Sequence, residues 1–160
     1  MSKSSFGRVG EVEITTVNAL SLFIGCKENW HAYQLIRDKQ TDGKDFLFLK
    51  FFLLGRSLEL GFKVLIRAKE GKSIEEIKNT FGHRIGDLLK HCVEQKYISF
   101  SKNEQEKIKQ LSKEYQSKLF EYIEMRTVEL PTFEVMEKIV GKLVTNIEEL
   151  FQSQTERKYL

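Results

Sequence analysis

Three groups of polar residues have the types and spacing that acid–base or phosphate chemistry requires. In the first group, Glu59 and Lys63 lie four positions apart with the acid nearer the N-terminus, which suits an ion pair on one helix face. The same face continues through the apolar residues from 52 to 66, so we expect partial shielding from water, where an acid and a base can have shifted proton affinities. A structural ion pair is the favoured interpretation, because such helix pairs are common without catalysis.

The second group lies in residues 81–89, Phe-Gly-His-Arg-Ile-Gly-Asp-Leu-Leu. Gly82 permits a tight approach of the backbone, and His83 falls at or near a helix start. Asp87 follows one turn later on the same face, where it could orient the imidazole. Both a small polar cluster and a structural lock between two helices fit this pattern. We favour the lock, because nothing else in the window is a convincing nucleophile or metal ligand.

The third group is Arg84 with His91, separated by six residues and therefore two turns apart on one helix face. An arginine that binds the scissile phosphate and a histidine that transfers a proton would form a ribonuclease pair. The spacing is a weak signal, because a short pattern of this kind also arises by chance.

Helices must position these groups, because apolar residues recur at helical spacing and alternating strand patterns are almost absent. Gly71 is the expected stop of a central helix, Ser73 with Glu76 forms a capping box, and Pro131 breaks the chain before the last helix. The predicted helices cover about 16–38, 44–68, 73–80, 85–96, 101–122 and 133–150. The helix at 101–122 has an apolar stripe of Ile108, Leu111, Tyr115, Leu119 and Tyr122. The last helix carries an apolar seam, which consists of Phe133, Met136, Val140, Leu143, Ile147 and Leu150. This seam suits either the core of the bundle or a dimer contact, and we favour the core.

These elements predict an all-α fold, a helical bundle of four to five long helices plus one short helix in its middle connection. The polar residues 40–44 are expected to link the first two long helices. We expect a flexible N-terminus over residues 1–12 and a single helical-bundle domain over residues 13–156. With 41% apolar and 31% charged residues in 160, the composition is that of one globular domain and excludes a disordered chain.

Composition also limits the ligands and the compartment. The net charge of +3 is too small to imply nucleic acid by itself, but residues 63–96 hold eight basic and five acidic side chains, which accounts for all of it. Cys26 and Cys92 stand outside any metal or disulfide spacing, so we expect buried thiols and neither a metal nor a cofactor. Without a secretory signal or an apolar run near 20 residues, a cytoplasmic protein without membrane contact is expected.

Two of these segments resemble a known family, the HEPN-like domains. Residues 55–66, Gly-Arg-Ser-Leu-Glu-Leu-Gly-Phe-Lys-Val-Leu-Ile, resemble that family's Glu-Leu-x-x-Lys-x-x-Leu helix, and residues 81–89 are similar to its Gly-His-Asp-Leu corner. Residues 120–124 and 130–133 resemble the tyrosine-containing turn and the proline-led last helix of some members. Glu59, Lys63 and His83 match the shared polar positions, whereas Arg84 stands where the family has an aspartate, with Asp87 its candidate substitute.

The resemblance implies an all-helical bundle, often dimeric, that occurs in prokaryotic toxin–antitoxin and defence systems. Some members cleave RNA without a metal through an Arg-then-His motif, and others are non-catalytic binding or scaffolding modules. We therefore expect a homodimer that binds or cleaves RNA or a nucleotide-containing partner, with a cognate antitoxin protein as a further partner. In a nuclease, His91 or His83 would transfer the proton, Arg84 would bind the phosphate, and Glu59 and Lys63 would shape the site.

Two alternatives stay open. A non-catalytic dimeric binding or scaffold module fits the same resemblance. Residues 72–83, followed by Leu88-Leu89 and Tyr97-Ile98, also resemble a winged helix-turn-helix of a DNA-binding regulator, with Gly82 in the turn and the positive segment placed for phosphate contacts. No hairpin wing is visible after Tyr97, so this interpretation ranks below the HEPN-like one.

Overall fold

The computed structural model describes residues 6–39, 45–124 and 126–157, with the side chains of residues 19–39, 45–124 and 126–154. These residues form six helices and no strand, which confirms the predicted all-α bundle. The helices are α1 (Phe6–Ile36), α2 (Leu47–Glu70), α3 (Ile74–Phe81), α4 (Ile85–Glu94), α5 (Lys102–Gln116) and α6 (Phe133–Arg157).

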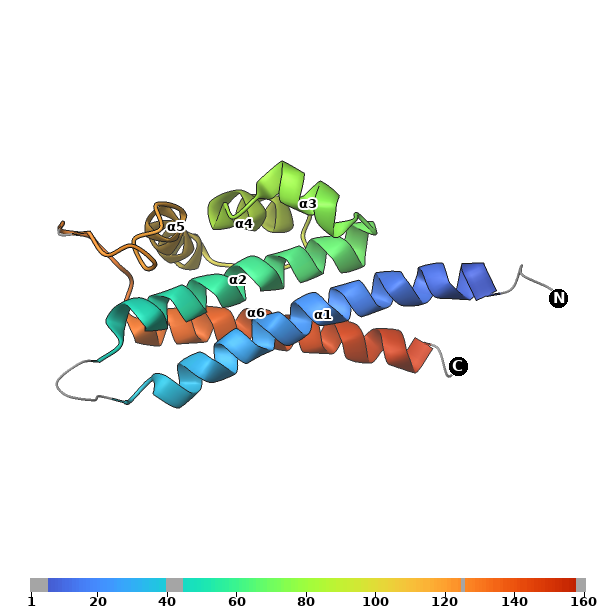
Figure 1. The fold of residues 1–160 in the computed structure, drawn as a ribbon, viewed down its shortest axis with the longest axis horizontal. Coiled ribbons are helices and arrows are strands. Elements are labelled where there is room, and N and C mark those ends of the chain that lie inside the picture. Colours follow the sequence, from blue (N-terminus) through green and yellow to red (C-terminus); the bar gives the residue numbers. More distant parts are fainter. Residues whose placement is uncertain (1–5, 40–44, 125, 158–160) are drawn as a thin grey trace.

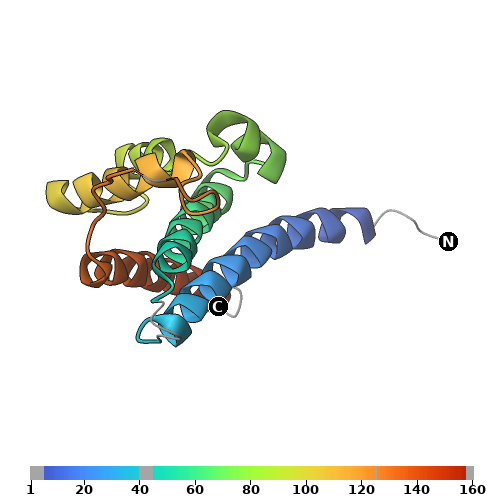
Figure 2. The ribbon, with the colours of Figure 1, turned by 60° about the vertical axis from the view of Figure 1, so that its left-hand side comes forward.

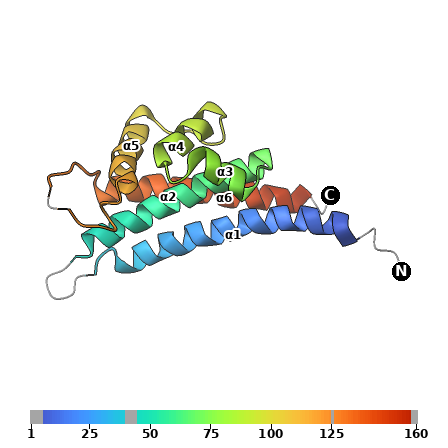
Figure 3. The ribbon, with the colours of Figure 1, turned by 45° about the horizontal axis from the view of Figure 1, so that its top comes forward.

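The bundle is built around α2, which contacts each of the other five helices. The long helices α1 and α6 run beside α2 on one side, and the shorter helices α3, α4 and α5 cover its other side (Figures 1, 2 and 3). The enclosure is most complete in the second half of α2, where residues 54–67 are all buried except the half-buried Arg56. The first half is almost entirely apolar but less enclosed, since Leu47 is 39% and Leu49 is 45% exposed. Polar residues in the second half of α2 are therefore enclosed by the bundle.

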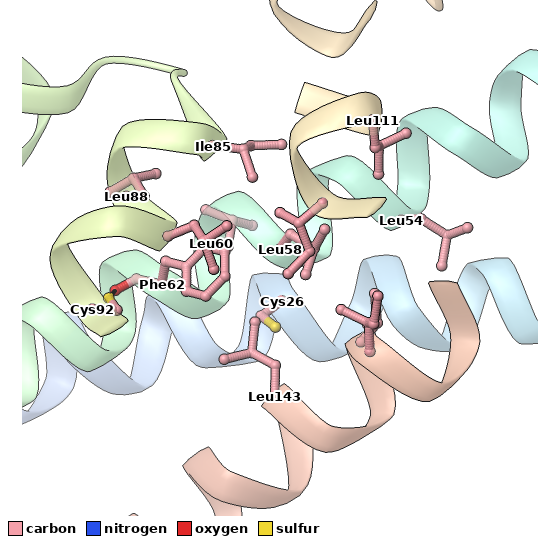
Figure 4. Packing of buried hydrophobic residues seen from close by; sticks show 14 of the residues in the cluster. Cys26, Leu54, Leu58, Leu60, Phe62, Ile85, Leu88, Cys92, Leu111 and Leu143 are labelled. Carbon is pink, nitrogen blue, oxygen red and sulfur yellow. Dashed lines mark hydrogen bonds between the residues drawn. The ribbon is translucent and has the colours of Figure 1, made fainter. Parts of the chain in front are cut away.

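The core lies on both sides of α2. Figure 4 shows Leu58 and Phe62 of α2 between Ile85 of α4 on one side and Leu143 of α6 on the other. The α6 seam packs into the core of the chain, which confirms the core interpretation of that helix: Met136, Val140, Leu143 and Ile147 are each 0% exposed, and Phe133 and Leu150 at its two ends are half-buried against the core.

The two cysteines are buried thiols, as expected. Cys26 donates a hydrogen bond to the carbonyl oxygen of Ser57 at 3.2 Å, and Cys92 to that of Phe62 at 3.8 Å. Burial raises the pKa of each thiol to about 12, so neither is reactive as a thiolate near neutral pH.

The predicted stop and cap signals of α2 and α3 are present. Gly71 ends α2 with φ 67°, and its N–H donates to the carbonyl oxygen of Arg67 at 3.0 Å. Ser73 and Glu76 form both bonds of the capping box at the start of α3. These interactions span at most four positions, which is why local sequence predicts them.

Helix bounds differ from the predictions by more than two residues at four places, one of which is the end of α6, at Arg157 rather than near residue 150. Helix α1 begins at Phe6, well before residue 16, because Phe6, Val9 and Val12 continue a helical spacing. Helix α2 begins at Leu47, and the predicted linker 40–44 lies outside the described residues. Helix α5 ends at Gln116 rather than continuing to Tyr122, because Lys118 takes a left-handed conformation, with φ 60°.

No helix in the described part of the chain is long and apolar enough to cross a membrane.

Candidate functional site

A buried carboxylate collects four donors from three parts of the fold. The side chain of Glu59 on α2 is 0% exposed, and its Oε1 accepts hydrogen bonds from Lys63 Nζ at 2.6 Å and from Arg56 at 3.1 Å. His83 Nδ1 lies 3.0 Å from the same oxygen, and the Tyr115 hydroxyl donates to Oε2 at 2.7 Å. We call these five residues the Glu59 cluster. The structure thus brings together Glu59, Lys63 and His83, three of the residues predicted from sequence.

Helix α2 supplies three members of the cluster from one face. Arg56 precedes Glu59 by three positions and Lys63 follows it by four, the two spacings that place side chains together on a helix. Because α2 is enclosed by its neighbours, this face is not a solvated surface, and Lys63 has only 10% of its side chain exposed. A buried carboxylate needs such partners, since an unpaired buried charge costs several kcal/mol.

His83 reaches the cluster from the corner between α3 and α4. Gly82 takes φ 56° and ψ −122°, a conformation open essentially to glycine alone. Its N–H donates to the Lys78 carbonyl oxygen at 2.8 Å, and the Arg84 N–H donates to that of Phe81 at 3.0 Å. The corner is therefore fixed by its own backbone, and it directs His83 at α2.

Tyr115 reaches the cluster from α5 because α2 has a glycine where the ring lies. A Cβ atom added to Gly55 would stand 2.5 Å from Cδ2 of the Tyr115 ring. The ring also stacks on Phe52 of α2, with 6.1 Å between the ring centroids. The absence of a side chain at Gly55 thus allows the phenol to lie close to α2 and its hydroxyl to reach Glu59.

The surroundings keep Glu59 ionised. Burial acts to raise the pKa of its carboxyl, but hydrogen bonds from Lys63 and Tyr115 and the charges of Lys63 and Arg56 outweigh this and hold the pKa below its usual value. Burial and the adjacent Glu59 charge raise the pKa of Tyr115, so its hydroxyl remains protonated and donates.

An ionised Glu59 determines the tautomer of His83. A carboxylate only accepts hydrogen bonds, so Nδ1 of His83 must carry the hydrogen, and in the neutral ring Nε2 then holds the lone pair. Nε2 makes no hydrogen bond to any residue that the structure describes, and 64% of the His83 side chain is exposed. A carboxylate that orients an imidazole whose other nitrogen is open is the arrangement of a general base.

Two cavities meet at the Glu59 cluster, and both are lined by Arg56 and His83. The first, which we call the apolar cavity, has a volume of about 240 Å³ and is otherwise lined by Leu22, Glu59, Leu60, Lys63, Ile74, Ile77 and Lys78. The second, which we call the polar cavity, has a volume of about 300 Å³ and is otherwise lined by Phe52, Arg84, Tyr115, Gln116, Lys118 and Glu121. We call the two together the groove.

The groove is positively charged. Five cations line it, Arg56, Lys63, Lys78, Arg84 and Lys118, against the two carboxylates of Glu59 and Glu121. Lys78, Arg84 and Lys118 are exposed to solvent. Glu59 is enclosed by its own partners and Arg84 is paired with Asp87, so the positive charge that a ligand meets comes mainly from Lys78, Lys118 and the exposed part of Arg56, which favours an anion such as a phosphate.

Asp87 does not orient His83, in contrast to the hypothesis from sequence. Its carboxylate pairs with Arg84, whose Nε lies 2.5 Å from Asp87 Oδ2, and Arg84 also donates to the Thr80 carbonyl oxygen at 2.6 Å. Arg84 precedes the first residue of α4, and Asp87 follows three positions later, so the two side chains meet on the outer face of the corner. The orienting carboxylate of His83 is Glu59.

His91 belongs to a second cluster, which we call the Glu70 cluster. His91 Nε2 contacts Glu70 Oε1, the Tyr97 hydroxyl donates to that oxygen at 2.9 Å, and Lys72 Nζ lies 2.7 Å from Oε2. The His91 ring also meets the Phe81 ring edge-on, with 5.2 Å between centroids, and its side chain is 24% exposed. Hydrogen bonds to His91, Lys72 and Tyr97 outweigh burial and lower the pKa of Glu70 to about 2.

The predicted Arg84 and His91 pair is therefore not brought together. Among the described side chains, no hydrogen bond, ion pair or ring contact joins the two, and each is held by a different carboxylate. His91 lines neither cavity of the groove, whereas His83 and Arg84 both line the polar cavity. If one histidine of the chain acts on a ligand in the groove, the geometry favours His83.

Several residues of the site were not singled out from sequence, among them the polar residues Arg56, Lys78, Tyr115 and Lys118. The signal for Arg56 was present, because it stands three positions before Glu59 on a helix. Tyr115 appeared only as a member of an apolar stripe. It lies 56 positions from Glu59, and no local pattern connects them.

Among the residues whose placement is described, no group of three or more His, Cys, Asp or Glu side chains is arranged to hold a metal ion. The chain matches no protein-family model, no curated protein and no solved structure. Of the HEPN-like resemblance, the all-helical bundle is what the fold bears out, and the family assignment stays a prediction.

Proposed function

We propose that this chain is a HEPN-like RNA-binding protein whose groove holds the phosphate backbone, and that His83 transfers protons there in metal-independent cleavage. One observation carries the proposal: two cavities lined by five cations share an imidazole that a buried carboxylate orients. A homodimeric state, a cognate antitoxin and a toxin–antitoxin or defence setting belong to this proposal through the resemblance alone.

The electrostatics of the groove support a phosphate ligand. Arg56 keeps one guanidinium nitrogen on Glu59 and lines both cavities, with 35% of its side chain exposed, so a phosphate can meet the rest of the guanidinium. Lys78 and Lys118 approach from opposite cavities. An RNA backbone that passes from one cavity to the other, across the boundary formed by Arg56 and His83, would thus meet a lysine on each side.

The orientation of His83 supports RNA over DNA for the reaction. Nε2 would accept the proton of a ribose 2′-hydroxyl, the 2′-oxygen would form a bond to the adjacent phosphorus, and the bond from phosphorus to the 5′-oxygen would break. The 5′-oxygen takes a proton from water, and His83 returns its proton to the resulting hydroxide, so the products are a 2′,3′-cyclic phosphate and a 5′-hydroxyl. Arg56 would stabilise the charge that develops on the phosphate.

The helix-turn-helix alternative is less favoured by the fold. Helix α4, which would be the recognition helix, packs against both α2 and α5. Its exposed positions are Asp87, Lys90 and Glu94, two acids and one base, which suit a DNA groove poorly. A non-catalytic binding or scaffold module remains the second candidate, and it is separated from the nuclease by the experiment below.

Binding is tested by fluorescence anisotropy of the full chain with labelled single-stranded RNA over a range of salt concentrations. The double variant Lys78→Gln/Lys118→Gln is expected to bind more weakly and to lower the slope of log K against log salt by about 1.4, since each lost phosphate contact on a single strand removes about 0.7. The control Lys90→Gln/Lys138→Gln removes the same charge from exposed lysines outside the groove. If the groove variant and the control lose the same RNA affinity, the groove is not the phosphate-binding site and the proposal is contradicted.

Cleavage is tested in EDTA with His83→Asn and His91→Asn. Asparagine at position 83 keeps an N–H donor near Glu59 and removes the basic nitrogen. We expect loss of cleavage in His83→Asn and retention in His91→Asn, with circular dichroism confirming that both are folded. If cleavage is lost only in His91→Asn, proton transfer belongs to His91, as the Arg84 and His91 pair predicts, and not to His83. Binding without cleavage by the wild type would favour the scaffold module.

A further inference from the structure

The two halves of the groove differ in the chemistry of their walls. The apolar cavity is walled by aliphatic side chains from three helices, namely Leu22 of α1, Leu60 of α2, and Ile74 and Ile77 of α3. The polar cavity is lined by phenol, amide, imidazole and charged groups together with the ring of Phe52, and by no aliphatic residue among those that the structure describes. Phosphate binding explains the polar cavity, but it does not explain an aliphatic cavity on the other side of the same Arg56 and His83 boundary.

The charges that line the apolar cavity are largely neutralised within the protein. Glu59 has no exposed side-chain surface, and Lys63 has 10% and bonds to Glu59 at 2.6 Å. What a ligand meets in this cavity is therefore mainly aliphatic, with Lys78 at one side and Arg56 with His83 at the boundary. Ile74, which is 41% exposed at the start of α3, presents an apolar surface there that no other described element covers.

The walls thus fit a ligand with an apolar body next to an anionic group. RNA has this combination in every nucleotide, since a base is joined through ribose to a phosphate. Because Arg56 and His83 line both cavities, a nucleotide with its base in the apolar cavity would place its phosphate near these two residues and the next nucleotide in the polar cavity. In a duplex the bases are stacked and paired inside, so only an unpaired nucleotide can place its base in a side pocket.

We propose that the apolar cavity, walled by Leu22, Leu60, Ile74 and Ile77, is a pocket for an unpaired nucleobase, which makes the groove selective for single-stranded or looped RNA. This inference rests on the proposed RNA-binding function and assigns its selectivity to contacts with the base. The backbone contacts at Arg56, Lys78 and Lys118 supply affinity without distinguishing single strands from abasic chains.

The test uses the full chain and three labelled probes: a short single-stranded RNA, the same strand paired with its complement, and a single strand of equal length in which the bases are absent. All three present phosphates, and only the first presents unpaired bases. We expect the wild type to bind the single strand about tenfold more tightly than the abasic strand, the effect of burying roughly one apolar group of side-chain size.

The variant Ile74→Gln tests the pocket, and Leu20→Gln is its matched control. Both replace an aliphatic residue with an uncharged polar one, and the wild-type exposures are nearly equal, 41% for Ile74 and 43% for Leu20, but Leu20 lines neither cavity. We expect Ile74→Gln to lose about tenfold in affinity for the single strand and to bind the abasic strand as the wild type does. Leu22→Gln provides a second variant from another wall of the pocket.

Three results would overturn the nucleobase pocket: equal wild-type affinity for the single-stranded and abasic probes, tighter binding of the duplex, or equal effects of Ile74→Gln and Leu20→Gln. These outcomes are distinct from failure of the proposed function. If Lys78→Gln/Lys118→Gln still weakens binding of the abasic strand, the groove binds phosphates and only the base pocket is wrong. If no RNA probe binds, both proposals fail.

Discussion

At the scale of single residues, the Glu59 carboxylate determines how the site works. Both of its oxygens accept hydrogen bonds, Oε1 from Lys63 and Arg56 and Oε2 from Tyr115, so it is a fixed anion that holds these groups and sets the tautomer of His83. The same five residues explain why a charge is tolerated in the bundle, because every part of the buried carboxylate has a partner. Stability and function are therefore coupled at Glu59.

We predict that Glu59→Gln lowers the free energy of unfolding by about 3 kcal/mol, because it leaves the buried Lys63 ammonium without its counter-charge. Urea denaturation of the purified variant measures this. The control Glu134→Gln breaks the pair of Glu134 with Lys138, which has the same spacing on α6 but side chains that are 78% and 73% exposed. That control should change stability by less than about 0.5 kcal/mol. A similar small loss in both variants would show that Glu59 is not structurally important.

We predict that Tyr115→Phe lowers the free energy of unfolding by about 1 to 2 kcal/mol, because Oε2 of Glu59 is left buried without a donor. The control is Tyr122→Phe. Tyr122 is 68% exposed, so the loss of its hydroxyl should have no measurable effect on stability. Thermal denaturation followed by circular dichroism compares the two. Wild-type stability of Tyr115→Phe would mean that the phenol does not bond to Glu59 in solution.

At the scale of elements, glycines decide how closely the helices approach. Gly55 allows the Tyr115 ring of α5 to lie against α2, and Gly82 turns the chain between α3 and α4 so that His83 faces α2. The cluster is thus assembled by a helix, a corner and a neighbouring helix, none of which contains the site by itself. Changes in backbone packing should therefore disturb the chemistry as well as the fold.

We predict that Gly55→Ala destabilises the protein by about 2 kcal/mol, although alanine is the better helix former, because its Cβ would stand 2.5 Å from the Tyr115 ring and force it to move. Gly141→Ala on α6 is the matched control. There the nearest atom outside its own helix, in Trp30, would lie 3.9 Å from the new Cβ, so we expect a gain of up to about 1 kcal/mol. Urea denaturation measures the change in the free energy of unfolding, which we expect to be negative for Gly55→Ala and positive for Gly141→Ala. A stabilised Gly55→Ala would contradict the observed packing.

At the scale of the whole molecule, the two clusters link helices that are distant in sequence. The Glu59 cluster joins α2 to the corner before α4 and to α5, and the Glu70 cluster joins the end of α2 to α4 and to Tyr97 beyond it. Both depend on an ionised carboxylate whose pKa is lowered by folding. Global stability should therefore respond to acid through these groups.

We predict that stability falls as the pH drops from about 4.5 to about 2, the range between the ordinary pKa of a glutamate and that of folded Glu70. A carboxyl with a lower pKa in the folded state contributes stability above its unfolded pKa and loses it as the pH falls through the folded value. Compared with the wild type, Glu70→Gln should be less stable near neutral pH and should lose less stability as the pH falls from about 4.5 to about 2. Urea denaturation at several pH values measures this, with Glu94→Gln, an exposed carboxylate on α4, as the control. If stability falls with pH as steeply in Glu70→Gln as in the wild type, Glu70 is not the group that makes the protein sensitive to acid.

The sequence by itself determined the helices and the contacts within them. The stop at Gly71, the capping box of Ser73 and Glu76, and the pair of Glu59 with Lys63 all involve residues at most four positions apart, where helix geometry alone decides which groups meet. The buried seam of α6 was predictable for the same reason, because helical spacing reveals an apolar face without showing its partner.

Only the tertiary structure decided which polar groups share a site. His83 meets Glu59 across 24 positions, and His91 meets Glu70 across 21. Local spacing had suggested Asp87 as the partner of His83 and Arg84 as the partner of His91. The physical reason is that spacing fixes the direction of a side chain relative to its own helix, whereas the packing of helices against α2 fixes which carboxylate lies in that direction. The choice of histidine for the groove therefore depends on how α3, α4 and α5 pack against α2.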